Sequence, residues 1–243
     1  MKYKLETIPV WDALNENCEC PFCILMEKAE ARYIKYYLGN SAMNPETRVE
    51  VNKTGFCPQH FSGLLLARSP QHLGLIAHTH LQHWMDDLDK KYPSRRKSLL
   101  ERLSRKGPTQ SEAFSDHIDN RTKSCLICDR IERTLKRYTF TSVYLWKNDE
   151  EGFRSGLESS KGFCIPHAKE LLLMGEEILN QQEFSEFATA IENLQKKNFE
   201  RLEEEINWFT QKFKSENHDK PWGSAEDAHY RLIQKLTGKI TAH

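Results

Sequence analysis

The stretches GFCPQH at residues 55–60 and GFCIPH at residues 162–167 repeat one pattern, Gly-Phe-Cys-x-x-His, 107 positions apart. A CxxC pair precedes each stretch, CPFC at residues 20–23 and CLIC at residues 125–128. Between the second Cys of CxxC and the Cys of GFCxxH lie 33 residues in the first copy and 35 in the second. A difference of two residues is easily absorbed in a loop. Two short motifs in the same order and at nearly the same spacing therefore indicate a duplicated unit.

The residue types of this unit are those of a zinc site. Zinc takes four Cys or His ligands in tetrahedral geometry, and each copy supplies three Cys and one His. Cys and His three positions apart share a helix face, and a CxxC pair at a helix start can converge on one ion. The Gly of GFCxxH allows a tight turn into the helix. Pairing each CxxC with the next GFCxxH predicts two zinc ions per chain. Their expected ligands are Cys20, Cys23, Cys57 and His60 for one ion, and Cys125, Cys128, Cys164 and His167 for the other.

Four protein ligands close the coordination sphere, and such sites stabilise a fold instead of binding substrate. A thiol-redox protein is an alternative, because CPFC alone is typical of a dithiol redox motif. It leaves both histidines unexplained, and no βαβ pattern surrounds the CxxC. A Cys–His nucleophile pair is a second enzymatic alternative. An iron–sulfur cluster is less favoured than zinc, because the fourth ligand is His and not Cys.

The segments after the CxxC motifs have helical periodicity, and strand signals are sparse. After Cys23, good helix formers combine with apolar residues three or four apart until Gly39-Asn40 supplies a stop signal. After Cys128, the same pattern continues toward Trp146. The expected fold is mainly α, with two diverged zinc-binding helical repeats (CxxC…GFCxxH) and C-terminal helices.

The C-terminal part carries one apolar stripe and one capping signal. The stripe favours a helix that docks on its own core, because fewer than three heptads are present, although it leaves a homodimer through this helix open. Ser224 and Asp227 predict a capping box for a last helix that stops at Gly238. Trp222, which follows a rigid proline, could bind a protein partner or anchor the tail to the body. The stripe consists of Phe199, Leu202, Ile206, Phe209 and Phe213.

At 243 residues, the chain is long enough to bury a core as one domain. We expect a single domain over residues 1–243. Its parts are a first zinc-binding helical repeat at 12–89, a basic linker at 90–110, a second zinc-binding helical repeat at 117–195 and a C-terminal helical extension at 196–243.

Charge and hydropathy limit the classes of function that the sequence supports. Lys plus Arg and Asp plus Glu number 35 each, so the whole chain has no electrostatic preference for nucleic acid or anionic membrane. No signal-peptide pattern and no apolar run of membrane-spanning length is present, which predicts a cytoplasmic protein without membrane contact. A reducing compartment disfavours disulfides and favours metal ligation by the cysteines.

The stretch 90–106 holds eight basic residues and one acid, Glu101. It could contact phosphates, which leaves nucleic-acid binding as a weaker alternative. A solvated linker is favoured because only one aromatic residue, Tyr92, is available to stack on a base.

Two further features stay outside the repeat. The histidines of QHLGLIAHTHLQH have no counterpart in the second copy, and an enzyme using this cluster is part of the enzymatic alternative. Cys18, the seventh cysteine, has no counterpart before Cys125 and is best interpreted as a spare thiol. The alternative is a redox sensor, in which Cys18 exchanges with a zinc ligand under oxidation and releases the metal. The histidines are His72, His78, His80 and His83.

Longer stretches around these motifs resemble one known family. They include TIPVWDA, ECPFC, GFCPQHF and LGLIAHTHL in the first half, and CLICDRIERTLKRY, YLWKNDEEGFRSGLESSKGFCIPH and KPWGSAEDA in the second. Together they extend over nearly the whole chain and resemble the bacterial family called domain of unknown function 6062. The resemblance implies a soluble cytoplasmic protein and no established activity. Gly152 departs from the family's pattern, which predicts an insertion or a helix interruption there.

These observations favour a structural or interaction module with two closed zinc sites over an enzyme. An interaction module leaves a protein partner open.

Overall fold

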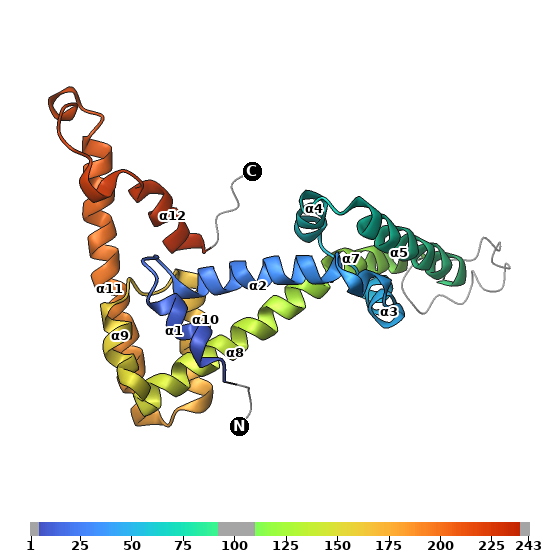
Figure 1. Ribbon diagram of the computed structural model, residues 1–243, viewed down its shortest axis with the longest axis horizontal. Coiled ribbons are helices and arrows are strands. Elements are labelled where there is room, and N and C mark those ends of the chain that lie inside the picture. Colours follow the sequence, from blue (N-terminus) through green and yellow to red (C-terminus); the bar gives the residue numbers. More distant parts are fainter. Residues whose placement is uncertain (1–4, 92–109, 239–243) are drawn as a thin grey trace. The chain divides into compact units, whose positions relative to one another are not determined.

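The computed structural model describes residues 5–91 and 110–238, and every regular element in those ranges is a helix (Figure 1). The predicted mainly α fold is confirmed. No described helix has the length and apolar character needed to cross a membrane. The predicted basic linker at 90–110 lies, apart from its ends, outside the described residues. The α-helices are α1 (Thr7–Leu14), α2 (Pro21–Tyr37), α3 (Pro45–Thr54), α4 (Pro58–Leu66), α5 (Pro70–Lys91), α7 (Gln110–Lys123), α8 (Leu126–Asn148), α9 (Phe153–Ser159), α10 (Ile165–Ile178), α11 (Gln181–Gln211) and α12 (Ala228–Thr237), and the short 3-10 helices are η1 (Asn40–Met43), η2 (Glu150–Gly152), η3 (Ser215–Asn217) and η4 (Gly223–Ala225).

The chain divides into two compact units. The terminal unit combines Met1–Lys28 with Arg133–His243, and the central unit is Ala29–Glu132. The points of division fall inside α2 and inside α8. Each unit contains the CxxC of one half of the chain and the GFCxxH of the other half. The repeats expected at 12–89 and 117–195 stay a prediction.

The central unit has an aromatic and aliphatic core. Helices α3 and α5 lie side by side in it (Figure 1). Tyr37 at the end of α2 is fully buried, and its ring meets the ring of Phe56 edge to face at 4.9 Å. Phe56 is the Phe of the first GFCxxH motif, so the motif anchors its own turn in this core. The buried core residues are Tyr37, Leu38, Ala42, Val51, Phe56, Leu64, Leu73, Ile76, Cys125, Leu126 and Ile127.

The terminal unit is built on α11, its longest helix. A capping box fixes its start, where the Asn180 side chain accepts from the Glu183 backbone and Glu183 accepts from the Asn180 backbone. Helices α10 and α12 pack against α11 and against each other (Figure 1). The predicted stripe contributes Leu202, which is fully buried, whereas Phe213 lies beyond the helix with 73% of its surface exposed.

The last helix follows the sequence prediction at its end and not at its start. It stops before Gly238, whose φ of 89° suits only glycine. The predicted capping box of Ser224 and Asp227 is wrong, because the Asp227 side chain caps no backbone N–H. Its Oδ1 instead accepts a hydrogen bond from Arg231 Nε at 2.7 Å.

The structure bears on the predictions for Trp222 and Gly152. Trp222 anchors the segment before α12 by packing against Phe209 and Phe213, with ring centroids 5.5 and 5.7 Å away. Gly152 has a φ of 75° and separates α8 from α9, which confirms the helix interruption.

Candidate metal centres

The four Cys/His motifs occupy four equivalent positions at helix starts. Cys57 and Cys164 are the N-cap residues of α4 and α10, and Cys20 and Cys125 directly precede α2 and α8. The second ligand of every motif lies three residues further, in the first helical turn, and therefore faces the same side as the first. The exposed N–H groups and positive dipole of a helix start stabilise thiolates.

The first cluster, centre I, lies in the terminal unit. His167 Nδ1 is 3.3 Å from Cys20 Sγ, 3.6 Å from Cys23 Sγ and 3.2 Å from Cys164 Sγ. The Sγ atoms of Cys23 and Cys164 are 3.7 Å apart. All three cysteines are buried, with at most 5% of their surface exposed.

The second cluster, centre II, lies in the central unit. His60 Nδ1 is 3.2 Å from Cys57 Sγ, 3.2 Å from Cys125 Sγ and 3.3 Å from Cys128 Sγ. The Sγ atoms of Cys57 and Cys128 are 3.8 Å apart. His60 and Cys125 are buried, Cys57 is half-buried and Cys128 is exposed.

Both clusters have the geometry of a tetrahedral metal site and could hold one ion each. With Zn–S near 2.3 Å and Zn–N near 2.0 Å, a tetrahedral arrangement separates two sulfurs by about 3.8 Å and a sulfur from a nitrogen by about 3.5 Å. The observed separations agree with these values to within a few tenths of an ångström. The same histidine atom, Nδ1, faces the three sulfurs in each cluster.

The predicted pairing of the motifs is wrong. The sequence favoured Cys20 and Cys23 with the GFCxxH at Cys57, whereas they lie with the GFCxxH at Cys164, and Cys125 and Cys128 lie with the one at Cys57. Helix length explains the exchange. At 1.5 Å per residue, α2 carries the chain about 25 Å and α8 about 35 Å away from their own CxxC before the next GFCxxH is reached. A gap of 33 or 35 residues alone does not reveal that 14 of the first (24–37) and 20 of the second (129–148) continue one helix.

Hydrogen bonds inside the clusters shift the pKa of several groups. In centre I, bonds with the two other thiols lower the pKa of Cys164, and the bond to Cys164 raises the pKa of Cys23. In centre II, burial disfavours charge on His60, but its hydrogen bonds to Cys125, Glu30 and Cys57 together outweigh burial and raise its pKa to about 10. The bond to His60, together with backbone hydrogen bonds, lowers the pKa of Cys125 despite burial. Each cluster thus favours one ionised thiol, the form that binds metal.

Glycines shape the turns into α4 and α10. Gly55 and Gly162 have φ of 75° and 73°, which confirms the expected tight turns. A Cβ on Gly162 would lie 2.5 Å from Gln195 Oε1. Gln195 is buried and holds the turn at Phe163, because its Oε1 accepts from Phe163 N at 2.8 Å and its Nε2 donates to Phe163 O at 2.7 Å.

His80 lies beside Gly55 in centre II as Gln195 lies beside Gly162 in centre I. A Cβ on Gly55 would lie 2.9 Å from the His80 ring, and His80 Nδ1 is 3.1 Å from Val51 O. Burial lowers the pKa of His80. His80 therefore supports the turn of centre II, and within the described residues the cluster His72 to His83 forms no group of potential metal ligands.

The two ligand-bearing turns of centre II are joined directly. Ser124, the residue before Cys125, donates from Oγ to Thr54 O at 2.6 Å. Leu126 N donates to Gly55 O at 3.2 Å. Beyond the ligands, His60 Nε2 lies 3.5 Å from Glu30 Oε1, and both side chains are largely buried. A carboxylate behind a ligating histidine orients the ring and raises its basicity.

The two turns of centre I are joined through a fully buried lysine, which the sequence analysis missed. Lys235 Nζ donates to Glu19 O at 2.7 Å and also to Lys161 O. Glu19 precedes Cys20, and Lys161 precedes Gly162, so these positions correspond to Ser124 and Thr54 of centre II. The only sequence signal for a buried Lys235 is its position on the apolar face of an amphipathic helix. Because lysines are rarely buried, that position alone does not predict the burial.

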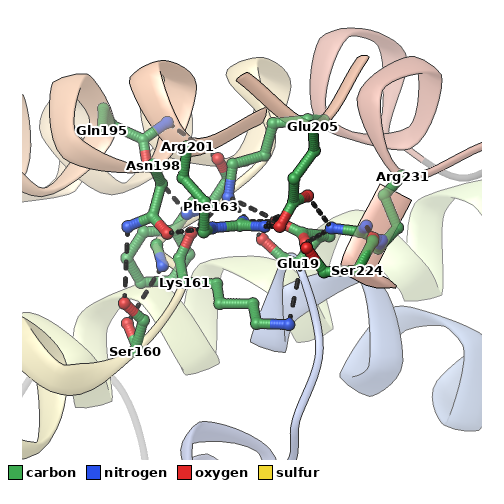
Figure 2. Close-up of polar contacts among 12 residues, drawn as sticks. Glu19, Ser160, Lys161, Phe163, Gln195, Asn198, Arg201, Glu205, Ser224 and Arg231 are labelled. Atoms are coloured by element: carbon green, nitrogen blue, oxygen red, sulfur yellow. Dashed lines mark hydrogen bonds and ion pairs between the residues drawn. The ribbon is translucent and has the colours of Figure 1, made fainter. Parts of the chain in front are cut away.

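The Glu19 carboxylate is buried among cations (Figure 2). It pairs with Arg201 Nη2 at 2.7 Å, Arg231 Nη1 at 3.2 Å and Lys235 Nζ at 3.6 Å. Glu205 on α11 completes the network through both arginines (Figure 2). This network ties α11 and α12 to the residue before Cys20.

Cys18 stays outside both clusters. Burial raises the pKa of its thiol to about 11, and its Sγ lies 3.9 Å from Ala13 O. These properties support a spare thiol in place of a reactive one.

An apolar groove of about 610 Å³ opens in the terminal unit between α10, α11 and α12. Half-buried side chains line it, among them Leu172, Phe199, Ile206 and Leu232. The acidic residues Glu192, Glu200 and Glu203 and the single lysine Lys196 also line the groove. No sequence pattern indicates this groove.

Comparisons with known proteins give one result. No curated protein and no solved structure matches the chain. A family described as a family of unknown function, DUF6062, matches residues 1–243, so the chain belongs to that family.

Proposed function

We propose that the protein is a cytoplasmic zinc-stabilised helical scaffold with one structural zinc ion in each centre. The arrangement of three sulfurs around one Nδ1 at 3.2–3.6 Å supports the proposal in both centres. Three thiolates and one imidazole are the ligands of structural zinc, and iron–sulfur clusters take Cys₄ sets more often.

The closed ligand sets support a structural role over an enzymatic one. A catalytic zinc keeps a position for water or substrate, whereas each centre offers four protein ligands. Each ion joins two helix starts, α2 with α10 in centre I and α4 with α8 in centre II. In centre I the ion connects segments more than a hundred residues apart in sequence, and in centre II segments about seventy residues apart. Each ion thereby stabilises the fold as a cross-link that closes a long loop does.

Metal analysis tests the scaffold. The protein purified without added metal should contain two zinc ions per chain, and replacement by Co²⁺ should give the visible spectrum of tetrahedral thiolate coordination. Removal of zinc with a chelator should lower the helical circular dichroism and the melting temperature, because zinc binding supplies folding energy. Protein that is folded, metal-free and carries a reversible disulfide would support the thiol-redox alternative instead.

We further propose that the groove in the terminal unit binds a partner helix with an apolar face and basic flanks. The lining supports this partner, because half-buried apolar side chains form it and three glutamates accompany one lysine. Apolar grooves between helices are common sites for amphipathic helices. Charge complementarity then selects a basic partner over an acidic one.

Two labelled synthetic helices of equal length test this partner, one built from Leu and Lys and one from Leu and Glu. Fluorescence anisotropy should show binding of the basic helix and weaker binding of the acidic one. Leu172→Glu should abolish the binding, while Leu65→Glu, an equal change at an exposed leucine of the central unit, should leave it intact. Equal affinity for both helices would refute the basic partner, and binding unchanged by Leu172→Glu would refute the groove.

A further inference from the structure

The two centres differ in the solvent exposure of their cysteine thiols. In centre I, Cys20, Cys23 and Cys164 are all buried. In centre II, Cys128 is exposed and Cys57 is half-buried. Oxidation of a thiolate depends on its access to the oxidant, so the two centres should not react alike.

The exposed thiol of centre II has a partner within reach. Cys128 Sγ lies 3.8 Å from Cys57 Sγ, and the two residues come from different helix starts, α8 and α4. Cys23 and Cys164 are as close in centre I, at 3.7 Å. Distance therefore does not distinguish the centres, and solvent access does.

The surroundings strengthen the difference. The turns of centre I are held by Lys235, a fully buried side chain, and by the ion network around Glu19. Centre II keeps its buried half, His60 and Cys125, and presents its other half to solvent. An oxidant can reach centre II without unfolding of the terminal unit.

We propose that Cys128 is an oxidation site for hydroperoxides and that its reaction releases zinc from centre II alone. The proposal rests on the presence of zinc in both centres. It adds a sensing role to a scaffold in which centre I keeps the fold intact.

The chemistry balances with one peroxide. The Cys128 sulfur, which zinc would hold as a thiolate, attacks the peroxide oxygen, the O–O bond breaks, and a sulfenic acid and one water form with uptake of one proton. The Cys57 thiolate then attacks the sulfenic sulfur, which forms the S–S bond and expels the second oxygen as water after protonation. Two thiolates lose two electrons and the peroxide gains two. Zinc loses two of its four ligands and dissociates, and a thiol reductant with added zinc restores the centre.

Stepwise oxidation of the two-zinc protein tests the proposal. Hydrogen peroxide is titrated while a chromogenic chelator reports free zinc and mass spectrometry maps the disulfides. We expect release of one of the two zinc ions, with a Cys57–Cys128 disulfide, before any disulfide among Cys20, Cys23 and Cys164. Release of both ions together, release of neither, or an earlier disulfide in centre I would overturn the proposal. Protein purified without zinc would instead refute the proposed scaffold, which keeps the two failures apart.

A matched pair of variants locates the reactive thiol. Cys128→His replaces one zinc ligand by another and removes the thiol that the peroxide attacks, and Cys23→His makes the same change in centre I. The first release should disappear in Cys128→His and persist in Cys23→His. If Cys128→His does not hold two zinc ions, the order of disulfides in the unsubstituted protein decides the question by itself.

Discussion

Cys23 Sγ lies 3.7 Å from Cys164 Sγ, although 141 residues separate the two cysteines in the sequence. The CxxC of the first half thus shares a cluster with the GFCxxH of the second half. The exchange makes the two halves of the chain depend on each other, because neither half contains a complete ligand set of its own.

Paired substitutions distinguish the observed pairing from the pairing within repeats. Cys23→Ser and Cys164→Ser should each reduce the zinc content from two ions to one, because each removes a ligand of centre I. The double variant Cys23→Ser/Cys164→Ser should still bind one ion. Cys23→Ser/Cys57→Ser, with one substitution in each centre, should bind none. Metal analysis of the four purified proteins measures all of these values, and a reversal of the two double variants would contradict the observed pairing.

Glu30 should tune the affinity of centre II for zinc. Its Oε1 lies 3.5 Å from His60 Nε2, the ring nitrogen that faces away from the sulfurs. Loss of a carboxylate behind a ligating histidine typically weakens metal binding about 10- to 100-fold. Glu30→Gln should therefore weaken one of the two zinc sites by that factor and leave the other unchanged, as measured by competition with a chelator of known affinity.

The control for this prediction is Glu27→Gln, the same change at an exposed position of the same helix. It should leave both zinc affinities as they are. A weakening of both sites by Glu30→Gln would mean that the substitution acts on the fold in general and not on centre II.

Alanine substitutions at Gly162 and Gly152 distinguish the cost of backbone strain from the cost of steric crowding. Both have positive φ, 73° and 75°, so alanine at either position costs about 1–2 kcal/mol of stability. A Cβ meets nothing within 4 Å at Gly152, whereas at Gly162 it displaces Gln195 Oε1 and breaks its hydrogen bonds to Phe163. Each lost buried hydrogen bond adds about 1–3 kcal/mol. In urea denaturation of the zinc-loaded protein, Gly162→Ala should be destabilised more than Gly152→Ala. Equal losses would show that Gln195 moves away freely.

Much of the fold was predictable because it depends on local signals. Helix periodicity and stop residues predicted α2 up to Gly39-Asn40 and α8 toward Trp146, and the repeated motifs predicted all eight cluster residues. The pairing of the motifs was not predictable from spacing, because it depends on how far α2 and α8 carry the chain from each CxxC. The capping box at Ser224 failed because α12 begins only at Ala228, and the Asp227 side chain accepts from Arg231 instead.

The buried lysine of α12 offers the sharpest test of how centre I is held together. Lys235 has no exposed surface and donates to the carbonyls of Glu19 and Lys161, the residues that precede the two ligand turns. Lys235→Met keeps the length of the side chain and leaves both carbonyls and the Glu19 carboxylate without this donor. Removal of one partner from a buried ion pair costs about 3–5 kcal/mol, and the two arginines that remain on Glu19 place the expected loss near the lower value. Lys169→Met, the same change at an exposed position of α10, should cost less than about 0.5 kcal/mol. Denaturation of the zinc-loaded proteins measures both losses. Zinc competition should also show a weaker centre I and an unchanged centre II, because only centre I has its turns joined through Lys235. A stable variant with two unchanged zinc affinities would mean that the metal alone holds the two turns together.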